Sequence, residues 1–202
     1  APEASLTDIE LAHGRMHVAA LRGLSDQLAD EIAAGGPTHA QIDPDTSINV
    51  HTWAASLRAA GAALAATDAV VAGELENAFC AVRPPGHHAC RDKAMGFCFL
   101  NNVAIAARYA LERHGLQRVA VVDFDVHHGN GTQHSFYKNP DLFYGSCHQA
   151  PFYPGTGARH ESGVASNIVN VPLARGCDSD TFRSRMSEEL LPALRKFKAD
   201  LL

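Results

Sequence analysis

The sequence lacks the features that mark several large classes of protein. Its five cysteines form no CxxC pair, which argues against a disulfide framework or a thiolate zinc site and favours a reducing compartment. It has no block of basic residues and a formal net charge of −5, so we expect no nucleic-acid partner. Because no apolar run approaches the ~20 residues of a membrane span and no signal peptide is recognisable, we expect no membrane partner and a cytoplasmic location.

Signatures of nucleotide binding and of nucleophilic hydrolases are missing as well. The run Gly129-Asn130-Gly131 has neither the Lys-Ser/Thr ending of a phosphate loop nor the GxGxxG spacing of a dinucleotide site. No GxSxG elbow and no Cys–His signature occurs. The residue in unusual supply is histidine, which accounts for 12 of the 202 residues.

Composition and apolar spacing predict one α/β domain over residues 1–202. The chain is 46% apolar and 19% charged, contains no repeat or linker, and is long enough to bury a core. Helical spacing predicts helices over residues 8–33 with a break near Gly14, and over 52–72, 101–114 and 182–197 with a kink at Pro192. Short apolar runs predict strands over 77–82, 118–122, 142–146 and 167–173, a strand beginning at 199–202, and a loop over 42–46. Strands that alternate with helices indicate a parallel sheet covered by helices on both faces.

Ligands of such sheets bind where the parallel strands end. Two polar clusters are expected there directly after strands, and a third after a Pro-Pro-Gly turn. They are residues 123–131, residues 146–148 and the pair His87-His88.

The cluster that begins at Asp123 predicts a metal site. Asp123, Asp125 and His127 are spaced at i, i+2 and i+4, which places their side chains on one face of an extended segment. Two carboxylates and an imidazole at the end of a buried strand need a compensating cation, and this mixture suits zinc, iron or manganese better than calcium. The plain alternative is an acidic helix cap, although the apolar residues at 122, 124 and 126 argue against a solvated loop.

The tandem histidines say less when taken alone, because two histidines in a surface loop would look the same. Neighbouring side chains of an extended segment point apart, so His87 and His88 can reach one substrate only if a turn bends them together. Pro84, Pro85 and Gly86 could impose that bend.

Four blocks of the sequence resemble the zinc-dependent histone deacetylase superfamily, which includes bacterial acetoin-utilisation-type and acetylpolyamine deacetylases. The blocks occur in the family's order across most of the chain, and Asn130 resembles the class II branch. They are residues 83–89 (Arg-Pro-Pro-Gly-His-His-Ala), 96–102 (Gly-Phe-Cys-Phe-Leu-Asn-Asn), 123–132 (Asp-Phe-Asp-Val-His-His-Gly-Asn-Gly-Thr) and 152–157 (Phe-Tyr-Pro-Gly-Thr-Gly).

The resemblance implies an arginase/deacetylase fold and a zinc amidohydrolase that removes an acetyl group from a lysine side chain or a related amine. It implies zinc ligands at Asp125 and His127, and a potassium or sodium ion held by Asp123 and Ser146. It implies that His87 and His88 are the catalytic pair, with Asp123 orienting the first and Asn130 beside the second. Substrate contacts are implied for Gly96 through its carbonyl, and for Phe97 and Tyr153 as aromatic walls of a tunnel.

The sequence also departs from the family pattern. The family's third zinc ligand follows the strand that opens with sequence like residues 199–202, and its carbonyl-polarising Tyr comes later still. The family's opening strand and first loop are not found either. We therefore expect an incomplete fold, truncated at both ends and inactive by itself.

Two other functions stay open at this point. One is an arginase-like hydrolase with two manganese ions, although the Pro-Pro-Gly-His-His block argues against it. The other is a non-catalytic module that binds acyl-lysine or an acyl-amine. Peptides with acetylated lysine and small acetylated amines are both candidate partners, and the sequence leaves a homo-oligomer open.

Overall fold

The chain folds into two compact units, Ala1–Tyr109 and Ala110–Leu202. The structure is a computed structural model, and it describes residues 1–202. That these residues form a single domain stays a prediction.

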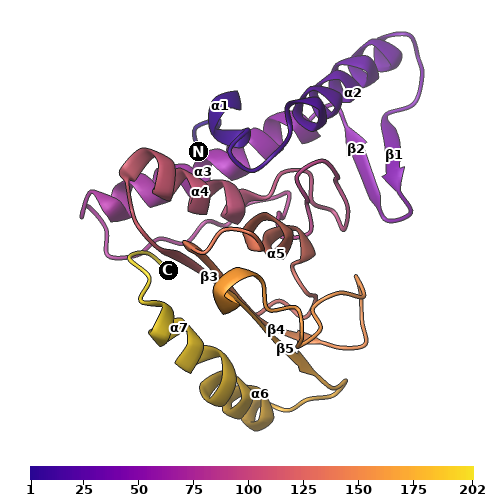
Figure 1. Cartoon of the computed structure of the whole chain (residues 1–202). Helices are drawn as coiled ribbons and strands as arrows, with labels where there is room; N and C mark the ends of the chain where they lie inside the picture. The colour runs from indigo at the N-terminus through magenta and orange to yellow at the C-terminus, as the bar shows by residue number, and fades with distance from the viewer. The chain divides into compact units, whose positions relative to one another are not determined.

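The first unit is mainly helical (Figure 1). The predicted break near Gly14 is confirmed, because a short helix ends before it and a long one begins after it. A Cβ at Gly14 would lie 2.0 Å from Asp92 Oδ1, so a larger residue there would require the exposed Asp92 side chain to move. The helices are α1 (Leu6–Ile9), α2 (Arg15–Ala33), α3 (Thr52–Val71) and α4 (Asn102–His114), of which α4 continues into the second unit.

Two predictions for the first unit need correction. The loop expected over residues 42–46 is shorter, because only residues 44 and 45 connect β1 (His39–Asp43) to β2 (Thr46–Asn49), and the two strands pair as an antiparallel hairpin. Its alternation of buried Thr46 and Ile48 with exposed neighbours is too short to be recognised in sequence. Residues 77–82 form no strand, and Phe79 is 94% exposed. An apolar run becomes a strand only where a neighbouring strand bonds to it, and this run has no such neighbour.

Helix α3 bears on the expectation that no segment crosses a membrane, which stays a prediction. By length and composition alone, it is apolar enough to cross a membrane. This is weak evidence, because a core helix of a soluble protein passes the same test. Ala60 and Leu64 of α3 are buried inside the first unit.

The second unit contains the predicted parallel sheet (Figure 1). Strands β3 (Val119–Asp123), β4 (Leu142–Gln149) and β5 (Ile168–Leu173) lie in that order, and Asp123 is the register partner of Ser146. Leu201 forms a parallel bridge with Val119, which agrees with a strand beginning at 199–202. Because all strands run the same way, their carboxyl ends gather the polar residues at one edge.

Helices cover both faces of this sheet. The face that carries Phe143 and Gly145 packs against a continuous helical stretch, with the rings of Phe143 and Phe197 5.3 Å apart. The face that carries Tyr144 packs towards α5 (Asn130–Phe136), whose first turn it contacts through Gly129. The stretch consists of α6 (Ser179–Arg185), the π-helical turn η2 (Met186–Leu190) and α7 (Leu191–Phe197), so the predicted irregularity lies just before Pro192. The α/β class with both faces covered is confirmed.

Candidate functional site

The segment that follows β3 brings Asp125 and His127 together. The Asp123 carboxylate accepts a hydrogen bond from the Asp125 N–H (3.1 Å), and the Asp125 carboxylate accepts one from the His127 N–H (2.8 Å). These two turns, rather than an extended strand, place His127 Nδ1 3.2 Å from Asp125 Oδ1. The predicted approach of the two side chains is therefore confirmed, by a different local geometry from the one expected.

The apolar residues that alternate with these polar ones, Phe124 and Val126, line a separate pocket. Phe124 and Val126 are 74% and 50% exposed, and both line a pocket of about 240 Å³ with Cys147 and Phe182. Alternating residues after β3 thus separate into a polar and an apolar side.

The Asp125–His127 pair fits part of a zinc site. Two ligands of one tetrahedral zinc, each about 2.0–2.2 Å from the metal, lie roughly 3.3 Å apart, close to the observed 3.2 Å between Oδ1 and Nδ1. A carboxylate oxygen and an imidazole nitrogen are donors that zinc accepts. No group of three or more His, Cys, Asp or Glu side chains suited to a metal occurs in the chain. These residues would therefore supply two ligands of a larger set.

Tyr144 fixes the carboxylate of Asp123, a role that the sequence did not reveal. The Tyr144 hydroxyl donates to Asp123 Oδ2 (2.9 Å) and accepts from the Gly129 N–H (3.0 Å). Burial, and then the negative charge of Asp123, raises the pKa of Tyr144 well above its usual range, so the hydroxyl keeps its proton and stays a donor. The sequence did contain one indication that Tyr144 lies at this site. Tyr144 precedes Ser146 by two residues, so the two side chains must share one face of β4.

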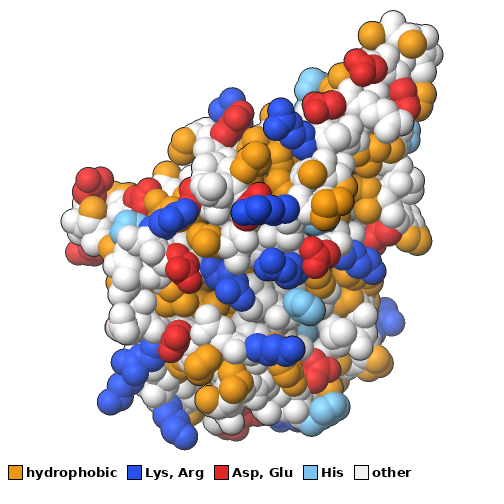
Figure 2. Space-filling model, turned by 45° about the horizontal axis from the view of Figure 1, so that its top comes forward, with side chains coloured by type: hydrophobic (Ala, Val, Ile, Leu, Met, Phe, Trp, Pro, Cys, Tyr) orange, Lys and Arg blue, Asp and Glu red, His pale blue; other side chains and the backbone are white.

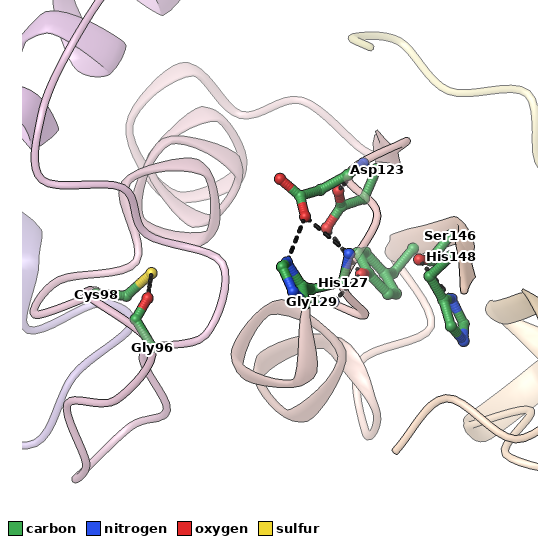
Figure 3. A network of polar contacts seen from close by, with 9 residues as sticks. Gly96, Cys98, Asp123, His127, Gly129, Ser146 and His148 are labelled. Carbon is green, nitrogen blue, oxygen red and sulfur yellow. Dashed lines mark hydrogen bonds and ion pairs between the residues drawn. The ribbon is translucent and has the colours of Figure 1, made fainter. Parts of the chain in front are cut away.

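Ser146 lies at the end of β4, buried beside His148. Its Oγ is 2.9 Å from His148 Nδ1, and both residues are about 1% exposed or less. In the sheet register Ser146 stands next to Asp123, and Figure 3 shows both at this edge. The structure therefore brings together the two residues expected to hold a monovalent cation.

A buried polar network fixes the loop that follows β4. His128 Nδ1 lies 2.7 Å from Thr156 Oγ1, and His128 Nε2 lies 3.0 Å from Gln133 Oε1. Burial, and then the neighbouring His148, lowers the pKa of His128 to about 4, so this imidazole is neutral at pH 7. Glu161 closes the network by accepting from Gln133 Nε2 (2.6 Å) and from the N–H of Gly157 (3.2 Å).

The aromatic residues of this loop lie beside His127. The ring of Phe152 stacks on His127 with centroids 4.9 Å apart and planes 9° apart, and Tyr153 meets it edge-on at 5.9 Å. The predicted wall residue Tyr153 is thus next to the predicted metal ligand. Phe152 was missed, although it belongs to the same sequence block.

In the first unit, the Pro-Pro-Gly turn brings the two histidines together. The ring centroids of His87 and His88 are 4.0 Å apart, and His88 is buried. A Cβ at Gly86 would lie 2.6 Å from the Asn102 N atom, so the turn depends on glycine there. The expected bend between adjacent imidazoles is confirmed.

Gly96 and Phe97 lie in the same unit, in a tight turn. Phe97 is 56% exposed, as a wall residue would have to be. The Gly96 carbonyl accepts a hydrogen bond from the Cys98 thiol at 3.3 Å (Figure 3). Thiols are weak donors, so this carbonyl keeps capacity for a stronger partner.

Asn130 is the first residue of α5 in the second unit, and its N–H donates to the His128 carbonyl (3.0 Å). The pairs expected between His87 and Asp123 and between His88 and Asn130 each join one unit to the other. Both pairs stay predictions.

Comparisons with known proteins agree with the resemblance noted in the sequence. A family model described as the histone deacetylase domain matches residues 1–202. The chain is 41% identical over 206 residues to the histone deacetylase-like amidohydrolase of Pseudomonas aeruginosa, covering 100% of this chain and 52% of that protein. It is 41% identical over 211 residues to the chloroplastic histone deacetylase 10 of Oryza sativa subsp. japonica, covering 98% of this chain and 46% of that protein.

A solved structure shows the same fold. The acetylpolyamine aminohydrolase from Burkholderia pseudomallei matches with a TM-score of 0.85 and 33% identity, over 99% of this chain and 66% of that one. The chain spans about half the length of the curated relatives it matches. Its fold is that of the deacetylases and acetylpolyamine aminohydrolases, and the chain belongs to the histone deacetylase family.

Proposed function

We propose that the whole protein carrying this chain is a zinc-dependent deacylase that removes an acetyl group from a lysine side chain or a related small amine. The observation that carries the proposal is the arrangement around His127. One side of this imidazole faces the Asp125 carboxylate at 3.2 Å, and its ring stacks on an exposed aromatic residue, Phe152. A metal-ligand pair beside aromatic surface suits an apolar chain that ends in a carbonyl.

In this proposal Asp125 and His127 hold the zinc, together with ligands that the whole protein supplies. When bound, zinc polarises the acyl carbonyl and lowers the pKa of a water molecule towards 7. The half-exposed side chains of Asp125 and His127 leave room for further ligands and for substrate. The hydrogen bond from the His127 N–H to Asp125 fixes the orientation of the carboxylate before any metal binds.

The His87–His88 pair performs proton transfer. One imidazole takes a proton from the attacking water and later gives it to the leaving amine, which is general base and then general acid catalysis. The other, oriented by Asp123, stays charged and stabilises the developing oxyanion. Tyr144 supports these different roles of the two histidines, because its hydroxyl holds the Asp123 carboxylate in one orientation.

Phe97 and Tyr153 form the walls for the methylene chain of the substrate, and the Gly96 carbonyl accepts a hydrogen bond from its amide. Aromatic side chains pack well against methylene groups. The partner is an acetylated peptide or acetylated small amine. On the face drawn in Figure 2, basic and acidic side chains are interspersed, which supports a partner other than nucleic acid.

We also propose a potassium or sodium ion held by Asp123 and Ser146. Their register pairing places a carboxylate and a hydroxyl side by side, and such hard oxygen donors suit these ions. In the plain alternative Asp123 only orients His87, and Ser146 only contacts His148. Titration of the dialysed whole protein with potassium tests this, because activity independent of both monovalent ions would leave the plain alternative.

The deacylase proposal is tested by turnover of a fluorogenic acetyl-lysine substrate together with metal analysis. One zinc per chain with acetate release supports it. Two manganese ions per chain with urea-forming hydrolysis would support an arginase-like enzyme instead. Binding of the acetylated substrate without turnover by the metal-loaded whole protein would support a binding module.

A further inference from the structure

The predicted wall residue Phe97 has a backbone conformation that its side chain disfavours. Met95 and Cys98 exchange both backbone hydrogen bonds (3.1 and 3.0 Å), and the two residues between them have φ of 57° at Gly96 and 66° at Phe97. Two positive φ angles in a two-residue connection define a type I′ turn. Glycine adopts such angles freely, whereas a residue as bulky as phenylalanine is strained by them.

A hydroxyl from the β1–β2 hairpin holds this strained residue. The Phe97 N–H donates to Thr46 Oγ1 at 3.0 Å, and the Thr46 hydroxyl donates in turn to Asp45 Oδ1 at 2.9 Å. Thr46 is 1% exposed, so water does not compete for its hydroxyl. The hydroxyl is therefore satisfied as donor and as acceptor, and its direction is fixed.

The surroundings leave room for Phe97 to move if it were released. A pocket of about 410 Å³ in the first unit is lined by Phe97, by Ser47 and Asn49 of β2, and by Arg83 and Pro84. Phe97 is itself 56% exposed, so packing restrains it little. Strained residues keep their conformation only where the surrounding structure fixes them, and they are concentrated at functional sites.

We infer that Thr46 is a positioning residue, which fixes the backbone of Phe97 in its left-handed conformation and so sets where the aromatic wall stands for the substrate. The inference rests on the proposed function, in which Phe97 packs against the methylene chain of an acylated amine. Thr46 lies outside the sequence blocks of the family resemblance, in the segment whose strands the sequence did not reveal. Loss of its hydroxyl leaves the Phe97 N–H without its acceptor and lets the turn relax towards negative φ.

The test is steady-state kinetics of the zinc-loaded whole protein on a fluorogenic acetyl-lysine substrate. Thr46→Val keeps the shape and the preference for a strand but removes the hydroxyl, Thr46→Ser keeps the hydroxyl, and Ser47→Ala is the matched control on the exposed side of β2. A wall that binds ground state and transition state alike changes KM and not kcat. We expect Thr46→Val to raise KM by about five- to tenfold at unchanged kcat, with Thr46→Ser and Ser47→Ala within about twofold of wild type.

A double-mutant cycle separates positioning from a general loss of structure. If Thr46 acts through Phe97, Thr46→Val adds less than about twofold to KM when Phe97 is already alanine. An equal rise in KM in both backgrounds, or no rise in either, would overturn the inference while leaving the deacylase proposal intact. Absence of turnover in the wild-type protein would overturn the deacylase proposal, and the positioning role with it.

Amide hydrogen exchange gives a second readout that needs no variant. In the wild-type protein the Phe97 N–H should be protected to a degree comparable with the Cys98 N–H of the same turn. Exchange of the Phe97 N–H at the rate of an unprotected amide would show that Thr46 does not hold it, whether or not Thr46→Val folds.

Discussion

His127 Nδ1 and Asp125 Oδ1 lie 3.2 Å apart, and a second bond, from the His127 N–H to the same oxygen at 2.8 Å, fixes the pair. The two residues therefore meet through local turns of the chain. A pair fixed in this way is preorganised for a shared cation, since the two side chains need little rearrangement when the cation binds.

This relationship predicts the effect of removing either ligand. Asp125→Ala and His127→Ala should each lower the zinc affinity of the whole protein by more than about 100-fold, because ligand loss exceeds the effect of losing an outer partner. Competition titration with a chromogenic chelator measures it, and His134→Ala, an exposed histidine of α5, is the control. Wild-type affinity in either variant would show that the pair does not bind the metal.

Tyr144→Phe should destabilise the protein. The change deletes a buried hydroxyl and leaves the Asp123 carboxylate and the Gly129 N–H each short of one partner. We expect a loss of about 1–3 kcal/mol in the free energy of unfolding. Urea denaturation measures this loss, with Tyr137→Phe at a more exposed tyrosine as control. Equal stability of the two variants would mean that the buried hydroxyl contributes nothing.

Gly157→Ala tests the packing of the aromatic loop against the buried histidines. Gly157 has φ of 89°, and a Cβ there would lie 2.5 Å from His148 Nε2. Gly155→Ala is the matched control, because Gly155 has φ of 83° but open space around it. Both variants suffer backbone strain of about 1–2 kcal/mol, and Gly157→Ala should lose roughly 1–3 kcal/mol more from the steric clash. Equal unfolding midpoints for the two variants would argue against this packing.

Two buried histidines predict a loss of stability in mild acid. Burial, and then the charge of His17, lowers the pKa of His13 to about 4, and burial with His148 does the same for His128. Because these pKa values lie below the ordinary value of 6.5, the unfolded chain binds protons first as the pH falls. Each histidine thus leaves stability unchanged above about pH 6.5 and removes up to ~3 kcal/mol as the pH falls towards 4.

Urea denaturation at a series of pH values measures this effect. His128→Gln should flatten the loss of stability between pH 6.5 and 4, because it removes the buried imidazole that takes up the proton. His160→Gln, at an exposed histidine, should leave the pH profile unchanged. If the stability of His128→Gln fell as steeply with pH as that of the wild type, the loss of stability in acid could not be assigned to His128.

The sequence predicted the parts of the site that depend on local spacing. The approach of Asp125 to His127 follows from their separation by one residue, and the meeting of His87 with His88 follows from the rigid turn before them. The alternation of strands and helices also predicted the parallel sheet of the second unit. These features are fixed within a few residues or by strong apolar patterns.

Features that depend on partners distant in sequence were missed. Tyr144 contacts Asp123 across 21 positions, and Thr46 contacts Phe97 across 51. A hydroxyl on a strand carries no local mark of the group it will bond. The failed strand over 77–82 has the same cause, since strand formation depends on a neighbour that local sequence does not identify.

The most direct measurement is acetate release from an acetyl-lysine peptide by the whole protein, before and after removal of zinc. The account predicts zinc-dependent turnover that a chelator abolishes and added zinc restores. It further predicts that His88→Ala lowers kcat by about 10²–10⁴-fold while the protein keeps its zinc, since an acid–base group is lost and a ligand is not. Turnover unaffected by zinc removal, or loss of zinc in His88→Ala with residual turnover unchanged, would contradict it.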